Sequence, residues 1–326
     1  MMRRRYRTGV LSLVLSGAWI FPLDAAAAYP ERPIRYVIPS AAGGGPDTAA
    51  RIITAELGRQ MGQQVVVDNR PGGSGTIGTV MIAKAAPDGY TIGHGNILTL
   101  GINRSVLPRL PYYPDKDLQP VVQMYFTPNL LTVTPSLPLK SVQELIDYAR
   151  QNPDRLLYAS TGSGSSIHVS GELFKLMTGT QMVHVPFKAA ALAITDLTAG
   201  RVHLMFDNIN SIGPHVKAGR LRGLAVTSAK RVPAFSELPT VEEAGLPGFV
   251  VTAWAGVIVP AGVPKAIVAR LNAEVNKALD APAVREKLAA QGLEVVGGTP
   301  EQFAGHIRKE AAKWADVVKR AGVKVD

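Results

Sequence analysis

Three short segments rich in glycine and hydroxyl residues offer the clearest chemistry in the sequence. They are SAAGGGPDT at 40–48, NRPGGSGTIGT at 69–79 and ASTGSGSSIHVSGELF at 159–174. Each follows an apolar run typical of a strand and precedes a helical pattern. A helix N-terminus presents free backbone N–H groups to an anion, and glycine lets a ligand approach the main chain closely. These segments therefore favour a carboxylate or phosphate site, although a tight turn with Asp47 as a helix cap explains the first one as well.

Nucleotide and metal chemistry are weakly supported by residue spacing. Gly73, Gly75 and Gly78 match the dinucleotide pattern G-x-G-x-x-G, but residues 70–72 separate them from the strand and no acidic residue ends the next strand. The six histidines lack H-x-x-x-H spacing, and the chain has no cysteine. We therefore expect no metal and no cofactor.

Nucleophilic catalysis is a second interpretation of the third segment. Ser163, Ser165 and Ser166 lie close to His168 in the sequence, which would suit a hydrolase that uses Ser163 or Ser166 with His168 as the base. The chain lacks the G-x-S-x-G motif, and serines at a helix start usually cap the helix. The sequence therefore favours an anion-binding segment here over a catalytic one.

Strand-like runs alternate with helical patterns along the chain. The first series has strands at 34–38, 64–68 and 90–93, with helices at 48–61 and 75–85. The second has strands at 130–135, 156–161, 181–187, 202–208 and 221–228, with helices at 141–151, 165–178, 191–199 and 212–218. Residues 264–323 are largely helical. The alternation predicts an α/β fold of βαβ units around a mostly parallel sheet, with two lobes between which the chain crosses more than once.

The end of the fourth strand in the second series carries two polar residues. Asp207 and Asn208 follow the apolar run VHLMF. Their side chains either face a cleft or belong to a turn or helix cap, and the sequence does not separate these roles.

Residues 1–28 are typical of a cleavable secretory signal. Four arginines lie among the first seven residues, an apolar stretch follows at 10–23, and Ala26 and Ala28 offer a cleavage motif. The apolar stretch is too short for a transmembrane span. The net charge of +10 falls to +7 without this segment, and the remaining basic residues are scattered. We therefore expect an exported protein with no nucleic-acid partner.

Longer stretches of the chain closely resemble one family of receptors. They include YPERPIRYVIPSAAGGGPDTAAR, VVVDNRPGGSGTIGTVMIAKAAPDGYTI, LPTVEEAGLPGF and GGTPEQFAGHIRKEAAKWADVVK. These stretches resemble the tripartite tricarboxylate transporter substrate-binding proteins, the Bug/TctC family. The resemblance runs in uniform order from Tyr29 to the C-terminus.

The resemblance implies a two-lobed periplasmic binding protein of type II, the Venus-flytrap form, with a ligand cleft between the lobes. It implies lobe 1 at 29–127, lobe 2 at 128–250 and a return to lobe 1 at 251–326. It further implies a monomeric, non-enzymatic receptor that delivers a small carboxylate to a membrane permease of one large and one small subunit. A receptor that presents its ligand to a sensor is a variant of this expectation.

The resemblance also implies which residues bind the ligand. The proximal carboxylate is expected on main-chain N–H groups of two loops, one in each lobe. The matching positions are Ser40, Ala41, Ala42, Gly43, Gly44 and Asp47, with Gly75 and Thr76, in the first lobe, and Thr161, Gly162, Ser163, Gly164, Ser166, His168 and Asp207 in the second. Where the family often has glycines, this chain has Ala189, Ala190 and Ala191, which stiffen that loop. The sequence does not identify the carboxylate.

Overall fold

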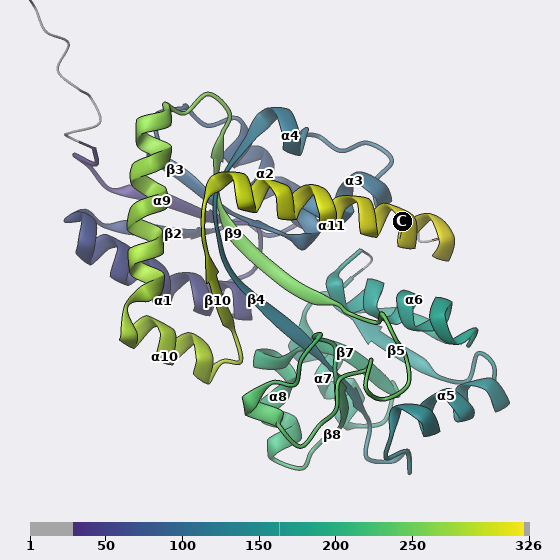
Figure 1. Ribbon diagram of the computed structural model, residues 1–326. Coiled ribbons are helices and arrows are strands. Elements are labelled where there is room, and N and C mark those ends of the chain that lie inside the picture. The colour runs from purple at the N-terminus through teal and green to yellow at the C-terminus, as the bar shows by residue number, and fades with distance from the viewer. Residues whose placement is uncertain (1–28, 163, 323–326) are drawn as a thin grey trace, which may run out of the picture.

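Two α/β lobes are joined along one long strand in the computed structural model of the chain, which describes residues 29–162 and 164–322 (Figure 1). The predicted signal segment 1–28 and the candidate residue Ser163 lie outside the described residues. Within the described ranges, no helix has the length and apolar character needed to cross a membrane.

The secondary-structure elements follow the predicted alternation at 34–93 and 130–228, whereas the segments 97–129 and 252–260 contain elements that were not predicted. The first lobe begins with β1 (Ile34–Ile38), α1 (Gly45–Met61), β2 (Val65–Asn69), η1 (Gly73–Gly75), α2 (Thr76–Ala83), β3 (Thr91–Asn96), the π-helix η2 (Ile97–Ile102), α3 (Asn103–Val106), α4 (Pro114–Asp117) and β4 (Leu118–Val133). The second contains α5 (Val142–Gln151), β5 (Leu157–Ser160), α6 (Ser166–Thr178), β6 (Val183–Pro186), α7 (Ala190–Thr198), β7 (Leu204–Asn208), α8 (Ile209–Lys217), β8 (Arg222–Val226) and η3 (Pro233–Phe235). The chain then returns through β9 (Thr252–Pro260), α9 (Lys265–Asp280), α10 (Pro282–Ala290), β10 (Glu294–Gly297) and α11 (Pro300–Ala321).

The strands lie in the order β2-β1-β3-β9-β4-β7-β5-β6, and β8 and β10 also pair with β4. β1 is parallel to β2 and β3, and β5 is parallel to β6 and β7. β4 and β9 are antiparallel to their partners. The expected parallel βαβ units therefore form the outer part of each lobe, whereas the expectation of a mostly parallel sheet is wrong for the centre.

The long strand β4 belongs to both lobes. Its residues 118–128 pair with β9, and its residues 129–133 pair with β7 and β8. The sequence predicted a strand only from residue 130, because Pro120 and Pro128 are unusual in a central strand. Register shifts between Pro120 and Val122 and between Gln123 and Tyr125 accommodate the irregular backbone.

The chain returns to the first lobe beside the point where it left. The N–H of Val251 donates to the Thr227 carbonyl in the second lobe at 2.8 Å, and the next residue, Thr252, pairs with Pro128. Two neighbouring segments thus connect the lobes, which is the arrangement that permits hinge closure.

The C-terminal helix α11 fixes the junction between the lobes. It packs on β4, η2 and α3 and also on α6 of the second lobe, as Figure 1 shows. Trp254 of β9 and Trp314 of α11 both donate their indole N–H to Oε2 of Glu310, at 3.2 and 3.0 Å. Lys313 Nζ donates to the Val250 carbonyl at 2.6 Å. The helix therefore contacts both lobes and the segment through which the chain returns.

Several helices begin with a side-chain cap, whereas two helices that border the cleft, α1 and α8, do not. Ser141, Ser165 and Thr299 accept a hydrogen bond from the third backbone N–H of α5, α6 and α11. By contrast, Gly44 and Asn208 begin α1 and α8 without a side-chain cap. The first N–H groups of α1 and α8 are thus not satisfied by their own cap residue.

Candidate functional site

Two adjoining cavities lie between the lobes. The inner one has a volume of about 200 Å³ and the outer one about 760 Å³. Six residues line both cavities, namely Ser40, Gly45, Pro46, Thr161, Asn208 and Asn210. The N-terminal ends of α1, α6 and α8 all reach the inner cavity, so three positive helix-dipole ends meet in one small space.

The structure divides the predicted site residues into two groups. The cavities are lined by Ser40, Ala41, Ala42, Gly43, Gly44, Thr161, Ser166 and Asp207. The residues that do not line either cavity are Asp47, Gly75, Thr76, Gly162, Gly164 and His168. The second group lies behind the lining, where its contacts hold the loops in place.

Asp47 organises the first loop from behind. Its Oδ2 accepts the N–H of Gly43 at 2.8 Å and Nε of Arg51 at 3.1 Å, and its Oδ1 accepts from Asn69 at 3.1 Å. Asn69 also donates to the carbonyl of Ser40 at 3.2 Å. Burial alone would raise the pKa of Asp47, but the hydrogen bonds from Arg51, Gly43 and Asn69 outweigh it and hold the pKa below its ordinary value. The Asp47 carboxylate therefore fixes the loop, and its negative charge is balanced by Arg51.

The dinucleotide-like glycines are packing positions. A Cβ atom on Gly78 would lie 2.9 Å from Cα of Pro39, and one on Gly75 would lie 2.8 Å from Thr99 and 3.5 Å from Pro39. Gly75 also has a positive φ of 80°. The 73–78 segment thus supports Pro39, which precedes the first loop, from the side away from the cleft.

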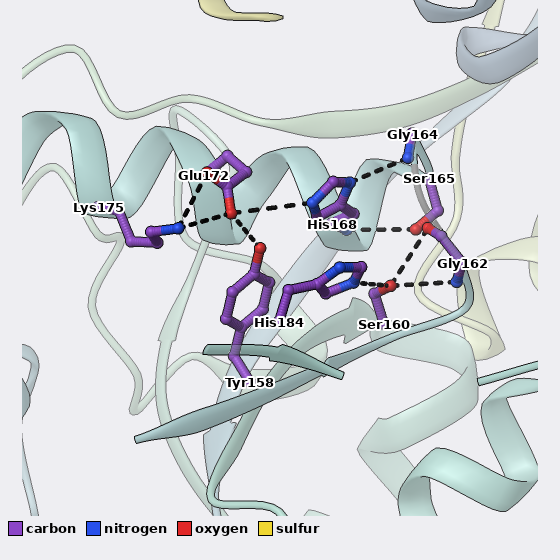
Figure 2. Close-up of polar contacts among 9 residues, drawn as sticks. All are labelled: Tyr158, Ser160, Gly162, Gly164, Ser165, His168, Glu172, Lys175 and His184. Carbon is purple, nitrogen blue, oxygen red and sulfur yellow. Dashed lines mark hydrogen bonds and ion pairs between the residues drawn. The ribbon is translucent and has the colours of Figure 1, made fainter. Parts of the chain in front are cut away.

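The second-lobe loop is held by two histidines, as Figure 2 shows. Nδ1 of His168 accepts the N–H of Gly164 at 2.9 Å. Nε2 of His184 lies 2.6 Å from Oγ of Ser160, which in turn accepts the N–H of Gly162 at 3.0 Å. The two imidazoles thus fix both ends of the loop that follows β5.

The surroundings of these histidines keep them neutral. The two rings stack with their centroids 3.9 Å apart, and Tyr158 stacks on His184 at 5.0 Å. Burial, followed by the charge of Lys175, lowers the pKa of His168 to about 4. Burial, followed by the neighbouring His168, lowers the pKa of His184 to about 4. The hydroxyl of Tyr158 donates to Glu172, which also accepts from Lys175 at 2.9 Å (Figure 2).

His168 is not arranged as a base for a serine. Its Nδ1 is occupied by Gly164, and its Nε2 faces Oε1 of Glu172 at 3.8 Å. Ser165 is the α6 cap and accepts from the N–H of His168 at 3.2 Å. Among the residues that the structure describes, no group of three His, Asp or Glu side chains is arranged to hold a metal ion.

Asp207 is an almost fully buried acid at the wall of the outer cavity. Its exposed fraction is 1%, so its charge receives little help from solvent. Oδ1 accepts the N–H of Asn208 at 2.7 Å, and Oδ2 accepts the Ser211 hydroxyl at 2.8 Å. Burial outweighs these hydrogen bonds and raises the pKa of Asp207 to about 6.

Several lining residues were not found from the sequence. Tyr125 and Thr127 of β4 and Trp254 of β9 line the inner cavity, and neither strand was predicted at those positions. Asn210 also lines the cleft, although only its place just after the strand VHLMFDN could have indicated it. The chain's own 188–191 segment borders the outer cavity.

Comparison with known proteins adds a family to this geometry. The family model TctC, described as "Tripartite tricarboxylate transporter family receptor", matches residues 49–323. A UPF0065 protein from the tcbD-tcbE intergenic region of Pseudomonas sp. (strain P51) is 42% identical over 318 residues, covering 97% of this chain and 94% of the relative. The protein BugT of Bordetella pertussis is 37% identical over 317 residues and covers 97% of each chain.

Solved structures share the fold as well as the sequence. R. palustris Rpa4515 with adipate is 43% identical with a TM-score of 0.86, covering 91% of this chain and 100% of that one. MatC (Rpa3494) from Rhodopseudomonas palustris with bound malate is 36% identical with a TM-score of 0.82, covering 89% of this chain and 100% of that one.

Proposed function

The chain belongs to the TctC family of tripartite tricarboxylate transporter receptors, and from this premise we propose that it captures a small carboxylate in the cleft between its lobes. The family consists of periplasmic solute-binding receptors. Adipate and malate, which are bound to two similar proteins, are both dicarboxylates. A dicarboxylate of about this size is therefore the ligand class we assign to this chain.

The observation that carries the proposal is the convergence of helix N-termini on the inner cavity. The N-terminal residues of α1 and α6, Gly45 and Ser166, line it from opposite lobes. Backbone N–H groups and helix dipoles offset the desolvation of a carboxylate without a fixed positive charge. Because each lobe supplies part of the hydrogen bonding, ligand binding favours the closed arrangement.

Within the cleft, we assign the direct contacts to the lining residues Ser40, Ala41, Ala42, Gly44, Thr161 and Ser166. Oγ of Ser40 is buried without a hydrogen-bond partner in the described chain. Its hydroxyl is therefore free to donate a hydrogen bond to a bound anion. The N–H groups of Gly43 and Gly164 already donate to Asp47 and His168. We therefore assign Asp47, Gly75, Thr76, Gly162, Gly164 and His168 to positioning the loops, and Gly43 to the turn that shapes the first one.

The same proposal covers lobe organisation and delivery. We infer lobe 1 at 29–127 and 251–326 and lobe 2 at 128–250, with closure about the two segments near Pro128 and Val251. The partner is a tripartite tricarboxylate-type permease with a large and a small subunit. We further propose that residues 1–28 direct export, that the receptor acts as a monomer, and that it catalyses no reaction.

A thermal-shift panel tests the proposed ligand class. Malate, adipate, succinate, citrate and benzoate are compared with their uncharged amides at equal concentration. A ligand at 100 times its dissociation constant stabilises the fold by about 2.7 kcal/mol, which raises the melting temperature measurably. Stabilisation by at least one acid and not by its amide supports the proposal. Equal stabilisation by acid and amide contradicts it.

A further inference from the structure

The strand at the outer edge of the first lobe has one unpaired side. β2 stands at the end of the strand order and pairs only with β1 among the strands that the structure describes. The carbonyl of Gln64 and the N–H of Arg70 form hydrogen bonds of 2.8 Å to β1. Because the backbone groups of successive residues point to alternate sides of a strand, those of Val65 and Val67 face away from β1. β2 therefore presents backbone donors and acceptors that another strand can pair with.

The strand at the opposite end of the sheet is blunted, whereas β2 is not. β6 has only four residues and ends at Pro186, which has no N–H to donate. β2 has five residues with no proline, and it pairs with β1 in continuous register. Its central residue, Val66, is 50% exposed. Native sheets commonly block an open edge with a proline or a bulge, so an edge with neither is suited to pairing with another chain.

A groove runs beside this edge. It has a volume of about 680 Å³ and lies between α1 and residues 62–67, which form the turn after α1 and the start of β2. It shares no lining residue with the two cavities between the lobes. An extended segment lying in the groove would add a strand to β2, which is a common mode of peptide recognition.

The groove is positively charged at its surface. Arg51 and Arg59 line it, and no acidic residue appears among its described lining residues. Each arginine has an acidic partner on α1, but that partner is shielded. The side chain of Arg51 is 53% exposed against 5% for Asp47, and that of Arg59 is 72% exposed against 17% for Glu56. The guanidinium groups therefore face solvent while the carboxylates lie behind them.

The other face of the edge has the same asymmetry. Arg35 of β1 and Arg70, which follows β2, both form ion pairs with Asp68 and are both more exposed than it. Arginine side chains thus flank β2 on the side of α1 and on the side of Asp68. This distribution complements an acidic partner.

We propose that β2 and its groove bind an extended, acidic segment of a partner protein by strand addition. Backbone hydrogen bonds to Val65 and Val67 supply the pairing, and the flanking arginines select acidic side chains. A second copy of this chain is a poorer occupant, because a twofold contact between two β2 edges sets the arginines of one copy against those of the other. Since this surface and the cleft have separate linings, docking and ligand capture are separate properties of the chain.

Three synthetic peptides test the proposal by calorimetric titration of residues 29–326. The first is a capped eight-residue peptide of alternating valine and glutamate, and the second replaces each glutamate with lysine. The third is the acidic peptide with alternate backbone amides N-methylated, which removes the hydrogen-bond donors along one edge. We expect saturable 1:1 binding of the acidic peptide, weakened by added salt. Both other peptides should bind at least about tenfold more weakly.

Two variants of the chain locate the binding. Val67→Pro removes one outward-facing N–H and leaves the bonds to β1 in place, and Val67→Ala is its matched control with the N–H kept. We expect affinity for the acidic peptide to fall at least about tenfold in the first variant and to change little in the second. Arg59→Glu reverses an exposed charge of the groove and should also weaken the acidic peptide. Melting temperatures and carboxylate binding confirm that each variant is folded.

A further variant separates the groove from the cleft. Gly44→Val obstructs the cleft and should bind the acidic peptide as the wild-type protein does. Weaker peptide binding in this variant places the glutamates in the cleft and overturns the proposal.

Other outcomes also decide against strand addition at β2. The proposal is overturned if the acidic peptide does not bind, if all three peptides bind equally, or if binding is unchanged in folded Val67→Pro and Arg59→Glu. Sedimentation of the wild-type protein tests the second-copy alternative. Self-association that Val67→Pro abolishes would assign the edge to another copy of this chain instead. None of these results changes the carboxylate-receptor function, which is measured on its own.

Discussion

The imidazole rings of His168 and His184 stack with their centroids 3.9 Å apart, and each ring holds a different end of the loop that follows β5 (Figure 2). Neither ring lines the cavities. The pair therefore acts on the second-lobe loop, whose backbone it keeps in one conformation.

This pair predicts how stability depends on pH. The pKa of each ring is about 4 in the fold, against 6.5 in the unfolded chain. Between these values the unfolded state binds more protons, so the free energy of unfolding falls as the pH decreases from 6.5 to 4. We expect the melting temperature at pH 4.5 to be lower than at pH 7 by roughly 5 °C or more. Calorimetric scans across this range measure it, and a constant melting temperature contradicts the neutral buried pair.

Asp207 changes stability with pH in the opposite direction from the histidine pair. Its pKa is raised to about 6 in the fold, so its contribution to stability is fully present below 3.8 and is lost as the pH rises through 6. Asp207→Asn keeps the acceptor for the Asn208 N–H and removes the buried charge. We expect the variant to be more stable at pH 7.5 by up to about 3 kcal/mol, with no gain at pH 3.5. Urea unfolding at the two pH values measures this, and an equal effect at both would exclude a charge-based cause.

Gly44→Val separates folding from binding. A Cβ atom on Gly44 would lie no closer than 3.6 Å to the Ala41 carbonyl, and the φ of −78° suits any residue. The variant should therefore fold with little change in melting temperature, while its side chain enters the outer cavity. We expect affinity for the best carboxylate to fall at least about tenfold, or about 1.4 kcal/mol. Unchanged affinity in the folded variant would place the ligand away from this loop.

Two neighbouring serines should give different phenotypes. Ser165 and Ser166 both line the inner cavity, but Oγ of Ser165 is engaged as the cap of α6. We expect Ser166→Ala to cost about 1–3 kcal/mol of binding free energy with little loss of stability, because a hydroxyl bond to a charged group is removed. Ser165→Ala should cost about 1 kcal/mol of stability. Calorimetric titration and thermal unfolding of both variants separate the two roles. A loss of binding in Ser165→Ala and of stability in Ser166→Ala would contradict this assignment.

Regular patterns explain why much of the fold could be predicted. Strand 34–38 matches β1, and the helix predicted at 165–178 differs from α6 by one residue at its start. The serine cap and glycine stop of α6 are local signals. β4 was mostly missed because its prolines conflict with strand propensity, and pairing with β9 on residues distant in sequence overrides that conflict.

The candidate site was predictable only in part, for a similar reason. Glycine-rich loops such as 40–45 can be recognised from sequence because they follow a strand and begin a helix. Which N–H groups face the cleft depends on distant side chains, as when His168 takes the N–H of Gly164. Asn210 reaches the site only because the lobes meet at Gly45, a contact that no local pattern contains.

Calorimetric titration of residues 29–326 with malate and adipate, each compared with its diamide, tests the central claim most directly. We expect saturable 1:1 binding of at least one acid and no binding of its diamide, because the cleft recognises a carboxylate through backbone donors. Binding of the diamide with the same affinity as the acid would contradict a carboxylate receptor built on this cleft. So would a Gly44→Val variant that binds the acid with unchanged stoichiometry and unchanged affinity.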